Sequence, residues 1–137
     1  MDLWAEFRLL DMGVRLGRFI GSYRTDYFDT PELSMYTDHH NGKLNRFKIR
    51  QREYVESNIR FVEVKYKSNK GRVIKDRIEK SYKDQVAFKG FINSHTPYDP
   101  NALSVILTNR FNRLTLVNLK LQERVTLDFN LSFSNMQ

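Results

Sequence analysis

Residues 45–56 alternate between two kinds of side chain. Cations stand at every second position from Arg46 to Arg52, and Tyr54 continues the same row. The positions between them are mainly apolar and carry Phe47, Ile49, Gln51, Glu53 and Val55. Successive side chains of a β-strand point to opposite faces of its sheet. The pattern therefore predicts a strand with one cationic face and one largely apolar face.

The next two segments repeat this pattern. A turn at 57–58 precedes a predicted strand over 59–67, and a turn at 68–71 precedes another over 72–79. Each of these strands has a charged row in which cations dominate. One such row is typical of a solvated outer face, since like charges repel unless water or an anion lies against them. Its repetition in three consecutive antiparallel strands favours a surface that binds anions.

The region before these strands is predicted to begin with a helix over 2–12. Leu3, Phe7 and Leu10 lie on one face of that helix, because they have i, i+4, i+7 spacing. Glycines interrupt the segment that follows, and their spacing does not match a dinucleotide-binding fingerprint. We interpret them as turns: Gly13, Gly17 and Gly21.

Residues 23–28 alternate again and predict a strand. The Thr-Pro pair at 30–31 suits a helix start, so the sequence predicts a single helical turn over 31–36. His39 and His40 follow in a predicted turn. A metal site at these histidines is not favoured, because no further ligand is evident nearby in the sequence.

The second half of the chain predicts a short helix in the region 81–93 that ends near 93–95, and an irregular connection over 96–100, where two prolines prevent regular structure. The period of two returns at residue 104 and predicts two more strands. In the first of them one row consists of Val105, Leu107, Asn109, Phe111 and Arg113. In the last strand the apolar face consists of Leu121, Val125, Leu127, Phe129, Leu131 and Phe133.

Length and composition limit the class of protein. A chain of 137 residues without an evident linker or repeat predicts one domain over 1–137, of α+β class and mainly antiparallel β. No cysteine is present, which excludes a disulfide scaffold. No apolar run approaches membrane-spanning length and no signal-peptide pattern occurs, so we expect a cytoplasmic protein without a membrane span. The net charge of +7 favours a polyanionic partner.

The charged rows together define the candidate site. Phosphate chains would match a concave surface of this kind, because arginine presents a planar fork to phosphate oxygens. Periodicity alone leaves open whether the rows face a cavity or bulk solvent. The candidate phosphate-binding residues are Lys48, Arg50, Arg52, Lys65, Lys67, Lys75, Arg77, Arg113 and Arg124. Glu63 and Asp128 occur in the same rows, where each could hold neighbouring cations in place or ligate a divalent metal.

Six short motifs occur over about residues 23–133. They are Tyr27-Phe28-Asp29-Thr30-Pro31 with Tyr36, Lys48-Ile49-Arg50-Gln51-Arg52-Glu53-Tyr54, Phe61-Val62-Glu63-Val64-Lys65, Val73-Ile74-Lys75-Asp76-Arg77, Phe111-Asn112-Arg113 and Arg124-Val125-Thr126-Leu127-Asp128. Together they resemble the VTC domain, the polyphosphate polymerase domain of the vacuolar transporter chaperone family within the triphosphate-tunnel (CYTH-like) superfamily. Each motif alone is weak, but six in the family's order are specific.

The resemblance implies an antiparallel β-barrel, present here in part, with a few short helices and a basic tunnel that holds a phosphate chain. It also implies that the charged faces point inward. By motif position, the tunnel cations are Arg50, Arg52, Lys65, Lys75, Arg113 and Arg124. Strand parity adds Lys48, Lys67 and Arg77 to this set. The family's divalent metal, manganese or magnesium, is implied as a cofactor.

The resemblance implies transfer of the γ-phosphate of a nucleoside triphosphate onto polyphosphate. Two alternatives are an inorganic triphosphatase and a non-catalytic module that binds polyphosphate, inositol phosphate or RNA. Nucleic acid ranks behind phosphate chains, because the aromatic residues are expected to lie mostly on the face opposite the cations, which disfavours base stacking beside phosphates. The aromatic residues interleaved with the cations are Phe47, Tyr54, Phe61 and Tyr66.

The family's first strand and its later strands, one with a metal-binding glutamate, have no counterpart in this sequence. We therefore expect a tunnel truncated at both ends and little polymerase activity from this chain alone. Open sheet edges expose unpaired backbone groups. A homo-oligomer formed by edge pairing and an open monomer are both compatible with such edges.

Overall fold

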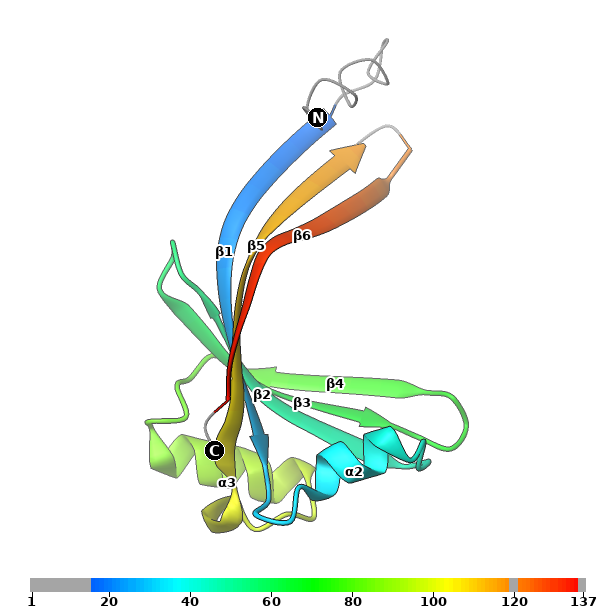
Figure 1. Cartoon of the computed structure of the whole chain (residues 1–137), viewed down its shortest axis with the longest axis vertical. Helices are drawn as coiled ribbons and strands as arrows, with labels where there is room; N and C mark the ends of the chain where they lie inside the picture. The colour runs from blue at the N-terminus through cyan, green and yellow to red at the C-terminus, as the bar shows by residue number, and fades with distance from the viewer. Residues whose placement is uncertain (1–15, 119–120, 136–137) are drawn as a thin grey trace.

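The computed structural model describes residues 16–118 and 121–135 (Figure 1). Six antiparallel strands form one sheet in the order β4-β3-β2-β1-β5-β6. Because β4 and β6 are its two edges, the sheet of the described residues is not closed into a barrel. The strands are β1 (Leu16–Asp29), β2 (Arg46–Tyr54), β3 (Ile59–Lys67), β4 (Val73–Ile78), β5 (Ser104–Asn118) and β6 (Glu123–Asn135). The mainly antiparallel α+β class is confirmed.

Helices α2 (Ser34–His40) and α3 (Gln85–His95) lie beside the lower part of the sheet, and the 3-10 turn η1 (Pro100–Ala102) follows α3 (Figure 1). The short helix expected in the region 81–93, with its end near 93–95, is confirmed as α3. The helix expected over 2–12 and the turn at Gly13 lie outside the described residues. No helix in the described part of the chain is both long and apolar enough to cross a membrane.

The core lies between α3 and one face of the sheet. Ile49 of β2 and Val62 of β3 are completely buried there, and Ile92 of α3 packs against them. Phe28 and Phe88 extend this cluster, with ring centroids 5.2 Å apart. The apolar row predicted for β2 therefore faces the core, and the cationic row of the same strand faces away from it.

The prediction for the segment after β1 was wrong in its bounds. Helix α2 begins at Ser34 rather than at residue 31, and it includes His39, which was expected in a turn. The cause is Asp29, a buried residue whose carboxylate accepts backbone N–H bonds from Met35 at 3.0 Å and Tyr36 at 2.9 Å. This carboxylate satisfies N–H groups of the first helical turn and ties α2 to the end of β1.

The prediction of turns at Gly17 and Gly21 was also wrong. Both glycines lie within β1, paired with Val117 and Arg113 of β5. The pairing of β1 with β5 runs from Leu16 to Asp29, whereas β2 covers only a part of that length. The long partner strand accounts for the continuation of β1 through glycines that have no strand preference of their own.

Two β-bulges change which face the side chains occupy. Between β1 and β5 the register shifts, so that Val105 pairs with Phe28 and packs against the core instead of sharing a row with Leu107. Between β5 and β6, two residues of β6 lie between the partners of Arg110 and Asn112. One of these two is Asn130, which has a left-handed φ of 54°. A bulge moves the following side chains to the other face.

The apolar row predicted for β6 is consequently divided. Phe129 pairs with Asn112, on the face that β2 and β3 turn toward the core. Phe133 pairs with Asn109, on the face that carries the cations. The expectation of one continuous apolar face through Phe133 was therefore wrong.

Candidate functional site

The nine candidate cations fall on one face of the sheet according to the strand register. Lys48, Lys65 and Lys75 lie directly abreast on β2, β3 and β4. Arg46 pairs with Lys67 in the neighbouring row. We call this surface the cationic face; it consists of Arg46, Lys48, Arg50, Arg52, Lys65, Lys67, Lys75, Arg77, Arg113 and Arg124. Arg46 was not among the candidate phosphate-binding residues, although its strand parity places it with them.

Like charges directly opposite each other on adjacent strands are destabilising. Lys48 and Lys65 are both exposed, and neither has a carboxylate partner among the described residues. Lys67, one row away, is also exposed and also has no carboxylate partner among the described residues. Along this part of the cationic face, no carboxylate of the described residues therefore compensates the positive charge.

Glu63 compensates the charge in the next row. Its side chain is almost completely buried, and its carboxylate contacts Arg50 Nε at 2.9 Å and Lys75 Nζ at 2.9 Å. Burial favours the neutral acid, but the hydrogen bond from Lys75 and the charges of Arg50 and Lys75 outweigh it, so the pKa of Glu63 is lowered. Glu63 therefore stays ionised and fixes two of the candidate cations in position.

Arg52 is held mainly by uncharged groups. Its Nε donates to Thr25 Oγ1 at 3.4 Å, and its guanidinium lies 5.7 Å from the ring centre of Phe111. Burial, reinforced by the nearby charge of Arg50, lowers the pKa of Arg52. A lowered pKa in arginine still leaves the group cationic, so an anion that approached Arg52 would neutralise a partly desolvated charge.

Aromatic rings adjoin these arginines. Phe61 pairs with Arg52, and Tyr54 continues the row of Arg52 as the alternation predicts, so both lie on the cationic face. The expectation that the aromatic residues lie mostly on the opposite face does not hold for these two. Phe47 and Tyr66 do lie on the opposite face, with ring centroids 4.7 Å apart. The ring of Phe61 is covered by the guanidinium of Arg77 at 4.2 Å.

A second group of rings is similarly occupied. Tyr23 stacks on Phe111 with centroids 5.2 Å apart and meets Tyr54 edge-on at 5.0 Å. The guanidinium of Arg113 lies 5.4 Å from the centre of the Tyr23 ring. Because these rings contact each other and the arginines, their main role in the structure is to support the guanidinium groups.

Arg113 and Arg124 lie toward the other end of the face. Asp128 accepts hydrogen bonds from Arg113 Nε at 2.7 Å and Nη2 at 3.0 Å. This hydrogen bonding raises the pKa of Arg113 and lowers that of Asp128. Arg124 pairs with Val117, four residues beyond Arg113 along β5, or about 13 Å at the usual rise of a strand. The structure therefore does not bring Arg124 together with the lysine row.

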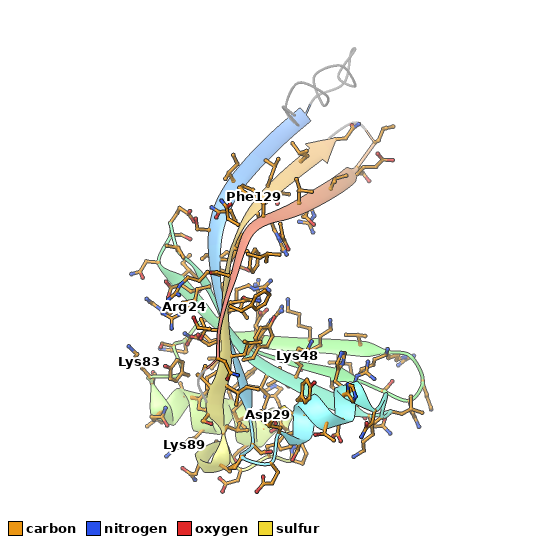
Figure 2. All side chains as sticks on the ribbon, viewed as in Figure 1. Arg24, Asp29, Lys48, Lys83, Lys89 and Phe129 are labelled. Atoms are coloured by element: carbon orange, nitrogen blue, oxygen red, sulfur yellow. The ribbon has the colours of Figure 1, made fainter. Side chains whose placement is uncertain are left out.

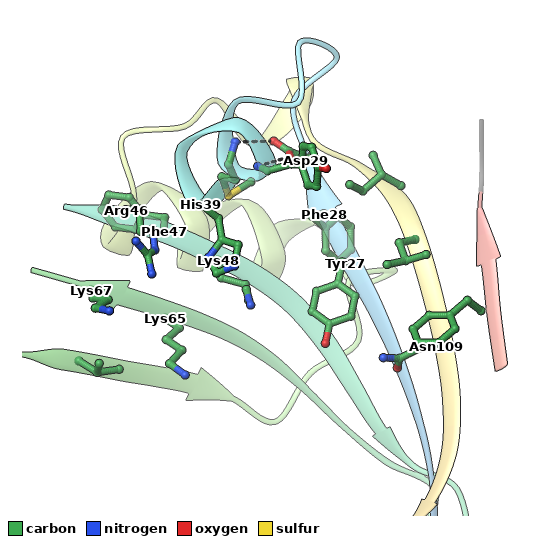
Figure 3. A pocket seen from close by; sticks show the side chains of 16 residues that line it. Tyr27, Phe28, Asp29, His39, Arg46, Phe47, Lys48, Lys65, Lys67 and Asn109 are labelled. Atoms are coloured by element: carbon green, nitrogen blue, oxygen red, sulfur yellow. Dashed lines mark hydrogen bonds between the residues drawn. The ribbon is translucent and has the colours of Figure 1, made fainter. Parts of the chain in front are cut away.

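A cleft of about 480 Å³ opens at the lysine end of the cationic face (Figure 3). Lys48, Lys65 and Tyr27 extend into it, and α2 forms one wall through His39. Asn109 lies across the cleft, and its buried Oδ1 has no hydrogen-bond partner among the residues that the structure describes. The full lining is Tyr27, Phe28, Asp29, Met35, Tyr36, His39, Arg46, Phe47, Lys48, Lys65, Lys67, Val73, Ile106, Leu107, Asn109 and Phe133.

Sequence reasoning missed His39 and Asn109 as lining residues. His39 was expected in a turn, and the sequence did not show the Asp29 contacts that anchor α2 beside the cleft. Asn109 was assigned to the row of Arg113, so its face could be predicted, but its unpaired oxygen could not.

The described residues do not match the divalent-metal site implied by the resemblance. Among them, no three His, Asp or Glu side chains come close enough together to hold a metal ion. Both oxygens of Glu63 and both of Asp128 already contact cations. Three strands of the sheet also separate β3 from β6, which carry these two carboxylates. A joint metal-ligand role for the two residues is therefore not supported.

Comparison with known proteins supports the family. The VTC domain family matches residues 17–137. This chain belongs to the VTC domain family. A search of curated protein sequences found no match. The X-ray structure, at 2.25 Å, of a proposed adenylate cyclase from Vibrio parahaemolyticus is similar to this VTC domain with a TM-score of 0.57 at 14% identity, covering 100% of this chain and 72% of the other.

The structural likeness concerns the fold alone, because the sequence identity is low. Together with the family match, it shows that this VTC domain is a triphosphate-tunnel-type domain whose described sheet is open. The family's motifs also acquire physical roles here. Asp29 of the first motif anchors α2, and Glu63 of the third motif holds Arg50 and Lys75.

Proposed function

We propose that the cationic face binds a phosphate chain, either triphosphate or longer polyphosphate, with Lys48, Lys65 and Lys67 as the main contacts in the cleft. The observation that carries this proposal is that Lys48 and Lys65 lie abreast and have no carboxylate partner within the described part of the chain. An arrangement that is unfavourable in the free protein becomes favourable when an anion lies across both strands. Family membership supports the same ligand class.

Arg50 and Arg52 are proposed to contact the chain further along the face. Glu63 leaves part of the Arg50 guanidinium free, since only its Nε is engaged in the ion pair. Among the described residues, Arg52 contacts the Thr25 hydroxyl and aromatic rings and forms no salt bridge. Both side chains could therefore offer further N–H donors to phosphate oxygens, in the fork geometry that such oxygens favour.

We extend the proposal to the family's reaction, with triphosphate hydrolysis as the alternative. A terminal oxygen of polyphosphate would form a bond to the γ-phosphorus of a nucleoside triphosphate, while the bond to the β–γ bridging oxygen breaks and the nucleoside diphosphate leaves. The role of the cations would be to align the two anions and to neutralise charge as it develops. No protein nucleophile is needed, since the attacking oxygen belongs to the phosphate chain.

Binding is tested by titrating tripolyphosphate calorimetrically into the protein and into a Lys48→Ala/Lys65→Ala variant. We expect the variant to bind about 10- to 100-fold more weakly, which corresponds to the loss of charge-assisted hydrogen bonds. A Lys83→Ala/Lys89→Ala variant is the control, because it removes the same charge from the helix side of the molecule (Figure 2). It should bind within about twofold of the parent.

Two results would count against the proposal. Equal weakening in both double variants would show that tripolyphosphate responds only to net charge. Tighter binding of an RNA oligonucleotide than of tripolyphosphate would favour nucleic acid as the ligand. Turnover is measured in the same preparations with ATP or tripolyphosphate plus Mn²⁺. We expect binding with little turnover, because the described residues offer no metal site, and robust polyphosphate synthesis would contradict that expectation.

A further inference from the structure

His39 lines the cleft but is not one of the residues of the cationic face. It lies in the last turn of α2, which packs against β1 and β2. Asp29 anchors the first turn of this helix. Figure 3 shows the His39 ring directed into the cleft, close to Lys48. The imidazole therefore lies beside the lysine row as a neutral or a charged group, depending on pH.

The charged groups around His39 are mostly cations. Arg46 and Lys48 approach it from β2, and Lys65 and Lys67 line the same cleft from β3. From β1, Tyr27 also lines the cleft, and the Asp29 carboxylate is engaged by the α2 backbone.

The groups on α2 itself do not reverse this balance. The rings of Tyr36 and His40 stack on each other with centroids 5.9 Å apart. The carboxylate of Asp38 contacts Lys43 at 3.7 Å rather than the imidazole of His39. The surroundings of His39 are therefore positive on the cleft side.

This environment disfavours the imidazolium form in the free protein. The charge of Lys48 lowers the pKa of His39 from its ordinary value of 6.5, and slight desolvation of this exposed side chain, together with Arg46, Lys67 and His40, lowers it further. At neutral pH the ring is consequently uncharged. An anion lying over Lys48 and Lys67 would cancel the charges that suppress protonation, and it would attract the imidazolium directly.

We propose that His39 becomes an additional binding cation when a phosphate chain occupies the cleft, taking up one proton as the ligand binds. This inference rests on the proposed function of the cationic face and adds a residue that none of the family motifs contains. The imidazolium has two N–H donors, so it could contact a phosphate oxygen in the same way as a lysine does.

The affinity of the protein for the phosphate chain should therefore depend on pH through the protonation of His39. Protonation of the phosphate chain at low pH reduces its charge and acts against binding. Protonation of His39 acts in the opposite direction. A comparison of variants separates the two effects, because the ligand titrates identically with each protein.

The test is calorimetric titration of tripolyphosphate into the parent protein and into His39→Gln, in two buffers with different ionisation enthalpies. Near pH 6.5 the parent should take up as much as about one proton more per bound ligand than the variant does. Between about pH 7.5 and pH 6, the parent should gain about three- to tenfold in affinity relative to the variant. His40→Gln is the matched control, since His40 is the next residue of the same helix and does not line the cleft.

A ring-resolved measurement completes the test. Histidine NMR signals should show the pKa of His39 rising by about one unit or more when tripolyphosphate is added, with a smaller change for His40. Equal proton uptake by the parent and His39→Gln would overturn this inference and leave the phosphate site in place. Loss of the extra proton in His40→Gln instead would also overturn it. Absence of tripolyphosphate binding by the parent at every pH would overturn the proposed function and this inference together.

Discussion

Two parts of the same sheet contain strands with alternating side chains, yet among the described residues only one of these parts has a covered apolar face. The backed part consists of β2, β3 and the ends of β1 and β5 beside them, where Ile49 is completely buried under the helices. The open part consists of residues 16–22, 112–118 and 123–129. There Leu127 is 39% exposed and Val125 is 50% exposed.

The difference lies in what packs against each part. Phe88 and Ile92 of α3 belong to the core cluster of the backed part, and none of the described helices contacts β6 closely. Alternation of side chains predicts that a segment forms a strand and which residues share a face. It does not predict whether another element covers that face, since this depends on the path of the chain elsewhere.

The largest expected effect is on packing. Ile49→Ala should lower the free energy of unfolding by about 2–5 kcal/mol, because it leaves a cavity in a close-packed site. Leu127→Ala should change it by no more than about 0.5 kcal/mol, because the side chain is already partly in water. Urea unfolding of both variants measures the two values. Similar decreases in the free energy of unfolding at the two positions would show that the open part is covered in solution, and would contradict the difference between the two parts.

The two carboxylates of the cationic face provide the next contrast. Glu63→Gln should destabilise the protein by about 1–3 kcal/mol, since it removes both ion pairs of a buried group. Asp128→Asn should cost less than about 1 kcal/mol, because the Arg113–Asp128 pair is partly exposed. Thermal melts at neutral pH compare the two variants.

The pH dependence of the melts sharpens the same contrast. Because the pKa of Glu63 is lower in the folded protein than its ordinary 4.5, the ionised carboxylate stabilises the fold above that pH. This stability is lost as the pH falls through the folded-state pKa. The parent should therefore lose more stability than Glu63→Gln on acidification below 4.5. Parallel acid curves for the parent and the variant would contradict the role assigned to Glu63.

The smallest expected effect concerns the backbone near the boundary with the open part. Asn130 has a φ of 54°, which a β-branched residue adopts only with strain. Asn130→Val should therefore lower stability by about 1 kcal/mol, whereas Asn130→Gly should be close to neutral. Denaturant midpoints of the two variants measure this. An equally stable valine variant would show that the bulge is not required for the pairing of β5 with β6.

Strand parity made much of the candidate site predictable. Once Lys48 and Lys65 fall on alternating segments joined by a short turn, an antiparallel hairpin places them on one face, and the structure has that register. The ion pairs of Glu63 were also open to prediction, because Glu63 lies in the same charged row. The phosphate-binding role of these residues stays a prediction, which the tripolyphosphate titrations test.

The errors come from interactions that act across the chain. Gly17 and Gly21 were interpreted as turns from local preference, but pairing with β5 overrides that preference. Helix α2 begins late because a single carboxylate, Asp29, binds backbone groups six and seven residues ahead. Val105 and Phe133 changed faces because bulges insert a residue, and a period-two pattern carries no mark of the insertion.

The bulge in β6 has a consequence for comparing this chain with other tunnel domains. On one side of Asn130 the even-numbered residues Arg124, Thr126 and Asp128 belong to the cationic face, whereas on the other side the odd-numbered Phe133 does. An alignment drawn on hydrophobic spacing alone would slip by one position at this point. In a relative without the bulge, the residue that such an alignment matches to Phe133 would lie on the face away from the tunnel, and the residue next to it would face the tunnel. Residue roles in β6 can be transferred between such domains only when the two segments are aligned separately.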